Sequence, residues 1–186
     1  MRVIGGSAKG IRLKSPFGYS VRPTSDKVRE SIFNILGGNL EHLYFLDLYA
    51  GTGAVGIEAI SRGAGNVTFV DKRLTCIELI RTNLSKCDFM HNFEIIQYDV
   101  LEAVPSLANR QRRYDIIFID PPYNSDLASE TLHTVHKNKI LKAGGRVIVE
   151  HSSRHQIEDS PLLFNFSRIK EYSFGDSALV LFENKE

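Results

Sequence analysis

The stretch Asp47-Leu48-Tyr49-Ala50-Gly51-Thr52-Gly53-Ala54-Val55-Gly56 decides the fold of this 186-residue chain. It ends an apolar run that begins at Tyr44 and opens a helix-like pattern over Val55–Arg62. Glycines are needed where a backbone turns sharply into a helix and approaches a ligand, toward which the first helical N–H groups point. The stretch therefore predicts a strand, a glycine loop and a helix, with a binding site at the loop.

Short apolar runs then alternate with longer amphipathic ones, which is typical of parallel strands joined by helical crossovers. The expected strands are Tyr44–Tyr49, Asn66–Val70, Phe93–Tyr98, Tyr114–Asp120 and Gly145–His151. The expected helices are Val55–Arg62, Leu74–Phe89, Leu101–Asn109 and Leu127–Lys139.

The last two strand-like segments differ from the others. Asn165–Phe174 and Ala178–Glu183 are separated only by Gly175-Asp176-Ser177, so they must form an antiparallel hairpin. The pattern predicts an α/β, Rossmann-like fold with a mostly parallel seven-stranded sheet and a C-terminal antiparallel hairpin. By analogy, this is the arrangement of class I S-adenosylmethionine-dependent methyltransferases, although a fold alone does not specify a substrate.

The first 40 residues form a basic N-terminal extension. Val3-Ile4 and Ile11–Leu13 flank a glycine-rich segment and predict a small hairpin. A helix from the N-cap candidates of Pro23–Asp26 to Leu36 has an apolar face of Val28, Ile32, Ile35 and Leu36, and Gly37-Gly38 ends it. We expect one domain over 1–186, with the extension at 1–40 packed on a catalytic core at 41–186.

Composition and charge narrow the functional classes. The chain is 42% hydrophobic, and no run is long enough to span a membrane or form a signal peptide. Cys76 and Cys87 lie eleven residues apart in one expected helix, about 16 Å, which is too far for a disulfide. We expect a cytoplasmic protein with reduced thiols, and nothing in the sequence requires more than a monomer.

The net charge of +1 hides an asymmetry. Residues 1–37 carry seven basic and two acidic side chains, a net of +5, which leaves −4 for the remainder. A basic segment on an acidic body suits a polyanionic partner, while an uneven solvated surface explains the charge equally well.

Three carboxylates stand at the ends of successive expected strands. Asp71 lies 20 residues after Gly51, where a ribose-binding acid is expected for either NAD or S-adenosylmethionine. Asp47 precedes the first glycine by four residues and suits a cationic amino-acid moiety better than a pyrophosphate. Asp99 can accept from an adenine amino group. These features favour S-adenosylmethionine, with S-adenosylhomocysteine as product, and the expected cofactor-binding residues are Asp47, Tyr49, Gly51, Thr52, Gly53, Asp71, Lys72, Asp99 and Val100.

The fourth expected strand ends in the turn Asp120-Pro121-Pro122-Tyr123, which is the candidate reaction centre. The amino group of a base is a poor nucleophile, because its lone pair is delocalised into the ring. A carboxylate and a backbone carbonyl that accept its hydrogens would steer the nitrogen toward a methyl group. Consecutive prolines make the turn rigid, and a tyrosine offers a face on which a flipped base can stack. A side-chain amide poses the same problem, so glutamine methylation remains an alternative.

The chain as a whole resembles the RsmD family. The resemblance rests on Val3-Ile4-Gly5-Gly6 with Gly10, Arg22-Pro23-Thr24, Val28–Asn34, Asp47–Gly53, Asp120–Tyr123 and Tyr172–Asp176, where Phe174 replaces the more usual Tyr. It implies methylation of a guanine 2-amino group in 16S rRNA, with the small ribosomal subunit or an assembly intermediate as partner. It also implies substrate contacts by Lys9, Arg12, Lys14, Arg22, Thr24 and Arg29, with Thr24 and Arg29 alternatively touching the cofactor.

Two other functions remain open at this stage. A DNA adenine or cytosine amino-methyltransferase would need an insertion that reads the major groove, and the chain has no room for one. A non-catalytic RNA-binding module would be expected to have lost the loop glycines or Asp120, and both are present. We expect no metal and no membrane partner. The Arg110–Arg113 cluster is more typical of a solvated loop, and His151 of a structural or peripheral residue.

Overall fold

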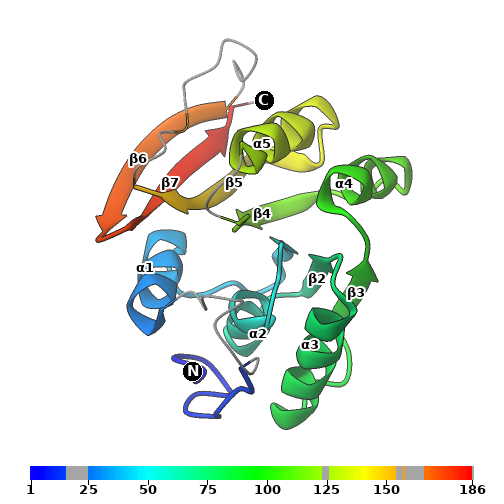
Figure 1. The fold of residues 1–186 in the computed structure, drawn as a ribbon, viewed down its shortest axis with the longest axis vertical. Helices are drawn as coiled ribbons and strands as arrows, with labels where there is room; N and C mark the ends of the chain where they lie inside the picture. The colour runs from blue at the N-terminus through cyan, green and yellow to red at the C-terminus, as the bar shows by residue number, and fades with distance from the viewer. Residues whose placement is uncertain (16–24, 123–125, 154–156, 158–165, 186) are drawn as a thin grey trace. The chain divides into compact units, whose positions relative to one another are not determined.

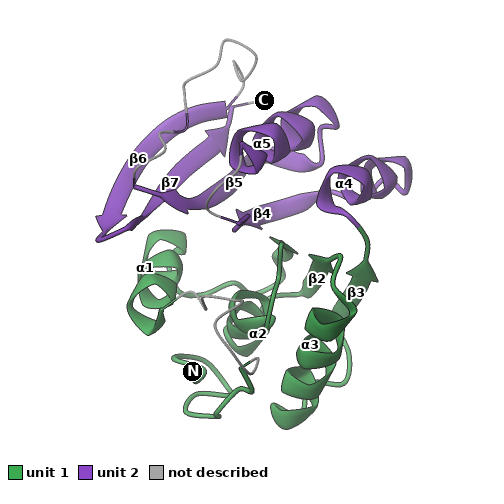
Figure 2. Cartoon of the chain, viewed as in Figure 1, with its two compact units in different colours: residues 1–98 green, residues 99–186 purple. Residues whose placement is uncertain are grey.

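The computed structural model describes residues 1–15, 25–122, 126–153, 157 and 166–185 (Figure 1). The chain divides into two compact units, residues 1–98 and 99–186 (Figure 2). The expected extension at 1–40 belongs to the first unit. The expectation that 1–186 form a single domain stays a prediction.

The first unit holds the glycine loop and three parallel strands. Its elements are α1 (Asp26–Leu36), β1 (Tyr44–Leu48), α2 (Ala54–Ser61), β2 (Asn66–Asp71), α3 (Leu74–Lys86) and β3 (Phe93–Gln97). The strands lie in the order β3-β2-β1, and both pairings are parallel. Helix α2 packs on β1 and β2, α3 packs on β2 and β3, and the two helices contact each other.

The second unit holds the strand that leads to Asp120. Its elements are α4 (Val100–Asn109), β4 (Tyr114–Ile119), α5 (Leu127–Lys137), β5 (Leu141–Ser152), β6 (Phe166–Phe174) and β7 (Ser177–Asn184). The strands lie in the order β4-β5-β7-β6. β4 pairs with β5 in parallel, whereas β7 runs antiparallel to both of its neighbours.

The predicted fold class is confirmed. Seven strands form a mixed α/β sheet that is mostly parallel and ends in an antiparallel hairpin. The hairpin loop is the two-residue Gly175-Asp176, because Phe174 already pairs with Ser177. Each predicted helix and strand is present, with bounds that differ by up to four residues.

The largest difference concerns β5, which begins at Leu141 and not at Gly145. The glycine pair there is typical of a turn, and Gly144 has a φ of +68°. The pairing of β4 with β5 is irregular between Tyr114 and Ile116, so the strand continues through a bulge. The Asn184 amide donates to the carbonyls of Leu141 and Lys142, which holds this early part of the strand.

The predicted N-terminal hairpin and helix are also present. The Val3 N–H donates to the Ile11 carbonyl at 3.0 Å and the Gly10 N–H to the Val3 carbonyl at 2.9 Å, which closes the hairpin. Ser25 caps α1 by accepting from the Val28 N–H, and Gly37 ends the helix in the left-handed region.

Close packing of α2 against β2 explains the last glycine of the loop motif. A Cβ at Gly56 would lie 2.2 Å from a ring carbon of Phe69, which is fully buried on β2. Only a glycine lets the helix approach the strand so closely.

Among the described residues, no helix is long and apolar enough to cross a membrane.

Candidate functional site

The carboxylate of Asp47 lies beneath the glycine loop and caps the helix that the loop opens. The side chain is 1% exposed, and its Oδ2 accepts from the Gly56 N–H at 2.9 Å. A carboxylate suits the first turn of a helix, where N–H groups have no partner within the helix. Burial, with a smaller contribution from the charge of Asp71, nevertheless raises the pKa of Asp47 to about 8.

Asp71 holds the other end of the loop. Its Oδ2 accepts from the Gly51 N–H at 2.9 Å, and its Oδ1 accepts from the backbone N–H and the guanidinium of Arg73. The hydrogen bond to Asp71 in turn raises the pKa of Arg73. Tyr49, between the two acids in sequence, has a φ of +62°. Non-glycine residues rarely adopt this conformation, and those that do concentrate at functional sites.

Asn83 is a site residue that sequence analysis missed. This α3 side chain is fully buried, and its amide donates to the Thr52 carbonyl of the loop at 3.0 Å. The same amide donates to the Lys14 carbonyl at 3.1 Å and accepts from the Lys14 N–H at 2.7 Å. No local sequence pattern marks an asparagine near the end of a helix as a partner of a segment 69 residues away.

The N-terminal hairpin is fixed to α2 by buried polar side chains. Glu58 is fully buried and accepts from the N–H groups of Ile4 and Gly5, each at 2.7 Å. Ser61 accepts from the Ala8 N–H and donates to the Gly5 carbonyl. A Cβ at Gly6 would lie 1.8 Å from the Ser61 carbonyl oxygen, so this position also requires glycine.

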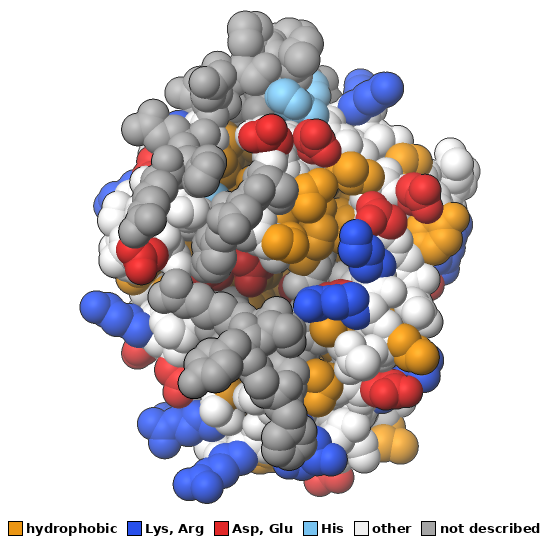
Figure 3. Space-filling model, in the orientation of Figure 1, with side chains coloured by type: hydrophobic (Ala, Val, Ile, Leu, Met, Phe, Trp, Pro, Cys, Tyr) orange, Lys and Arg blue, Asp and Glu red, His pale blue; other side chains and the backbone are white. Residues whose placement is uncertain are grey.

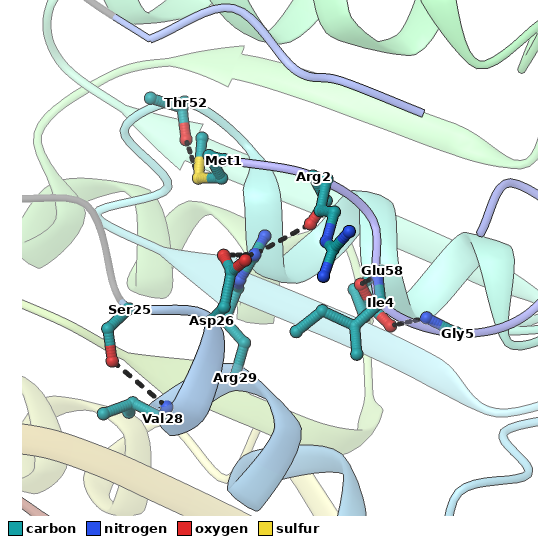
Figure 4. A network of polar contacts seen from close by, with 10 residues as sticks. All are labelled: Met1, Arg2, Ile4, Gly5, Ser25, Asp26, Val28, Arg29, Thr52 and Glu58. Atoms are coloured by element: carbon teal, nitrogen blue, oxygen red, sulfur yellow. Dashed lines mark hydrogen bonds and ion pairs between the residues drawn. The ribbon is translucent and has the colours of Figure 1, made fainter. Parts of the chain in front are cut away.

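Arg29 lies in the interior of the first unit. It is fully buried, and its Nη2 donates to Asp26 at 2.6 Å and to the Arg2 carbonyl at 2.8 Å (Figure 4). Its Nε and Nη1 have no hydrogen-bond partner within the described part of the chain, and burial lowers its pKa. Arg29 thus joins α1 to the hairpin, and its role toward cofactor or RNA stays a prediction.

The other basic side chains of the hairpin are exposed. Val3, Ala8 and Leu13 are buried, whereas Lys9, Arg12 and Lys14 point to solvent. Lys86 of α3 joins them, because its Nζ donates to the Arg12 carbonyl at 3.4 Å. Figure 3 has the orientation of Figure 1, and Lys and Arg side chains (blue) project at its lower left, in the region where Figure 1 marks the N-terminus. The hairpin therefore presents positive charge to solvent on a rigid support.

The remaining cofactor candidates have varied surroundings. Thr52 is 6% exposed, and its hydroxyl lies 4.0 Å from the Met1 sulfur, as Figure 4 shows. Lys72 is exposed beside Asp71. In the second unit, Asp99 is half-buried and caps α4 by accepting from the Leu101 N–H at 3.1 Å, and Val100 is buried behind it.

The candidate reaction centre follows β4 directly. β4 is buried along most of its length, Asp120 is half-buried just beyond it, Pro121 is buried and Pro122 is exposed. Tyr123, Arg22 and Thr24 lie outside the described residues. The first unit thus brings Asp47, the glycine loop and Asp71 together. In the second unit, Asp99 is the N-cap of α4, and Asp120 directly follows β4.

His151 and the Arg110–Arg113 cluster lie outside the loop and the Asp120 turn. His151 is buried, with its Nδ1 2.9 Å from the Ser152 carbonyl and its Nε2 3.8 Å from a Glu171 oxygen, and Glu171 also pairs with Arg168. Residues 110–113 are all exposed, which is typical of a solvated loop. Within the described ranges, no group of three or more His, Cys, Asp or Glu side chains could hold a metal ion.

Comparison with known proteins identifies the family. A family model described as "Conserved hypothetical protein 95" matches residues 1–183. The Haemophilus influenzae protein named Ribosomal RNA small subunit methyltransferase D is 31% identical over 188 residues, which cover 99% of this chain and 94% of that one. The chain belongs to the RsmD family.

Other relatives of this RsmD-family chain agree over its full length. The Bacillus subtilis protein YlbH is 36% identical over 185 residues, which cover all of both chains. A solved structure of the Escherichia coli protein yhhF superposes with a TM-score of 0.82 at 27% identity and covers 100% of this chain and 98% of that one. The match leaves neither protein with a large unmatched segment.

The buried carboxyl of Asp47 predicts a pH-dependent stability. Its pKa is about 8 in the folded chain against 3.8 for a solvated Asp, so between these values the folded state holds a proton that the unfolded state has lost. Stability should therefore fall as pH rises from 5 to 8, by up to ~1.4 kcal/mol per pH unit, which lowers Tm by about 3–6 °C per pH unit.

Asp47→Asn keeps an oxygen acceptor for the Gly56 N–H and cannot ionise. We expect its melting temperature, relative to that of the unsubstituted chain, to rise between pH 5 and pH 8. A difference in melting temperature that stays constant with pH would contradict the protonation of Asp47.

Proposed function

We propose that this chain transfers a methyl group from S-adenosylmethionine to the exocyclic 2-amino group of a guanine in 16S rRNA. The support is that the glycine loop, its carboxylates and the Asp120 turn are all intact in a chain whose whole length aligns with relatives named Ribosomal RNA small subunit methyltransferase D. This is the observation that carries the proposal. The partner is then the small ribosomal subunit or its assembly intermediate, in the cytoplasm.

The glycine loop and its acids suit S-adenosylmethionine. Asp47 is buried beneath the loop, where a nearby cationic amino-acid moiety would favour its ionised form. The ribose hydroxyls would be held by Asp71, whose carboxylate already bonds the Gly51 N–H, with Lys72 beside it. Asp99 and Val100 would receive the adenine, through the carboxylate and the first turn of α4. The cofactor would supply the electrophilic methyl group.

The Asp120 turn suits an amino-group acceptor. The Asp120 carboxylate and the Pro121 carbonyl would each accept one hydrogen of the guanine amino group, which aligns the nitrogen with the methyl group. On methyl transfer the guanine nitrogen would gain positive charge, and the Asp120 carboxylate would stabilise that charge until the nitrogen releases a proton to solvent. Tyr123 would stack on the flipped base.

The basic hairpin suits an RNA backbone. Lys9, Arg12 and Lys14 are exposed on a hairpin whose backbone is held by Glu58, Ser61 and Asn83. Rigid presentation lowers the entropy cost of binding phosphates. Arg22 and Thr24, and now Lys86, complete the proposed substrate contacts. The fully buried Arg29 would support them by joining α1 to the hairpin. The choice of guanine N2 over adenine or cytosine rests on the family resemblance alone.

Asp120→Ala tests the reaction centre. We expect methyl transfer to small-subunit rRNA to fall by at least about 100-fold, because the acceptor loses its alignment, while S-adenosylhomocysteine binding is unchanged. Asp115→Asn is the matched control, since Asp115 lies on β4, the strand that leads to Asp120, and pairs with Lys142 at 2.7 Å. Loss of cofactor binding with normal turnover at saturation would show that the role assigned to Asp120 is wrong.

Neutralising the hairpin tests the RNA contact. The triple variant Lys9→Gln, Arg12→Gln, Lys14→Gln should bind 16S rRNA more weakly and reduce the slope of log affinity against log salt by about two to three. The matched control replaces Arg110, Arg112 and Arg113 with Gln, which removes the same charge from the exposed loop before β4. An unchanged slope in the hairpin variant, or an equally reduced slope in the control variant, would contradict the assignment of the hairpin to the RNA interface.

A further inference from the structure

Asn83 connects two parts of the first unit that the proposed function uses separately. Its amide group makes three hydrogen bonds: two to the backbone of Lys14 and one to the Thr52 carbonyl. Lys14 ends the basic hairpin, and Thr52 lies between the two glycines of the cofactor loop. One side chain therefore bonds both the proposed RNA-binding segment and the proposed cofactor-binding segment.

The chemistry of the amide makes this connection rigid. Both N–H groups of Nδ2 are used, one on Lys14 and one on Thr52, and Oδ1 accepts from the Lys14 N–H. Asn83 is fully buried, so water cannot replace a bond that breaks, and an unsatisfied buried group is costly. The Lys14 backbone cannot move away without breaking bonds or dragging the amide with it.

The loop is held on both sides of Thr52. Asp71 accepts from the N–H of Gly51, the preceding residue, and Asp47 accepts from the Gly56 N–H four residues further on. A displacement of the Asn83 amide therefore acts on a short segment whose flanking N–H groups are fixed. Glu58 and Ser61 bond the hairpin to the body of α2 and Lys86 bonds it to α3, while the Met1 sulfur makes a 4.0 Å contact with the Thr52 hydroxyl. Asn83 is thus the residue that bonds the hairpin to the backbone of the loop in the contacts described above.

We propose that Asn83 is a positioning residue that couples RNA binding on the hairpin to cofactor binding at the glycine loop. The proposal rests on the proposed function, since it needs RNA at one end of Asn83 and S-adenosylmethionine at the other. Phosphates that engage the Lys14 side chain restrain the Lys14 backbone, and through Asn83 they restrain the Thr52 carbonyl. A loop that is already ordered binds the cofactor with a smaller entropy cost, and by linkage the cofactor favours RNA binding by the same factor.

The test measures that factor. The affinity for radiolabelled S-adenosylhomocysteine is determined by equilibrium dialysis, without and with a saturating unmethylated 16S rRNA transcript. We expect the RNA to tighten binding to the unsubstituted chain by about fivefold or more. Asn83→Asp keeps the acceptor for the Lys14 N–H but loses both donors, so each ligand should still bind and the RNA effect should disappear.

Ser61→Ala is the matched control. The substitution removes the hydrogen bonds of the Ser61 hydroxyl with Ala8 and Gly5 of the same hairpin. Neither of these bonds involves the glycine loop. If Asn83 only stabilised the fold, both variants would have a lower Tm, and in both the RNA would still tighten S-adenosylhomocysteine binding. Coupling through Asn83 predicts that the control keeps the effect. If Asn83→Asp does not fold, Asn83→Ser takes its place, because its hydroxyl cannot bridge Lys14 and Thr52 together.

The outcomes separate the two proposals. An unsubstituted chain that binds neither S-adenosylhomocysteine nor the transcript contradicts the proposed function. An unsubstituted chain that binds both, with no change in one affinity on adding the other, overturns the coupling alone. Retention of the full RNA effect in the Asn83 variant, or an equal loss in Ser61→Ala, also overturns it.

Discussion

The hydrogen bond from the Gly56 N–H to the buried Asp47 carboxyl is the interaction on which the rest of the first unit depends. It fixes the start of α2 directly above the end of β1, and the close contact of Gly56 with Phe69 sets how near α2 lies to β2. The glycine loop has to close the space between these two positions. Its conformation follows, with left-handed residues at Tyr49, Gly51 and Gly53.

The N–H and carbonyl groups of such a loop need partners, and buried side chains from other elements supply them. Asp71 at the end of β2 takes the Gly51 N–H, and Asn83 of α3 donates to the Thr52 carbonyl. The same solution recurs at the hairpin, where Glu58, Ser61 and Asn83 bond backbone groups of residues 4–14. A loop suited to a small cationic cofactor and a basic hairpin suited to RNA are thus parts of one polar network.

Much of this could be predicted from sequence because it depends on local patterns. Alternating apolar runs, the glycine loop and the N-cap at Ser25 each leave a signature within about ten residues. Glu58, Ser61 and Asn83 leave none, since a polar residue on an amphipathic helix suits solvent unless its distant partner is known. Arg29 is similar: its burial depends on Arg2, 27 residues away. The early start of β5 was missed because Gly144-Gly145 forms a bulge and not a turn.

The identity of the methylated atom is the most direct test of the proposed function. Small subunits from a strain that lacks this gene are incubated with the purified chain and methyl-labelled S-adenosylmethionine, and the RNA is digested to nucleosides and separated. We predict that the label appears in N2-methylguanosine. Label in a methylated adenosine or cytidine, in ribosomal protein, or only in duplex DNA offered as competitor would contradict guanine-N2 methylation of rRNA.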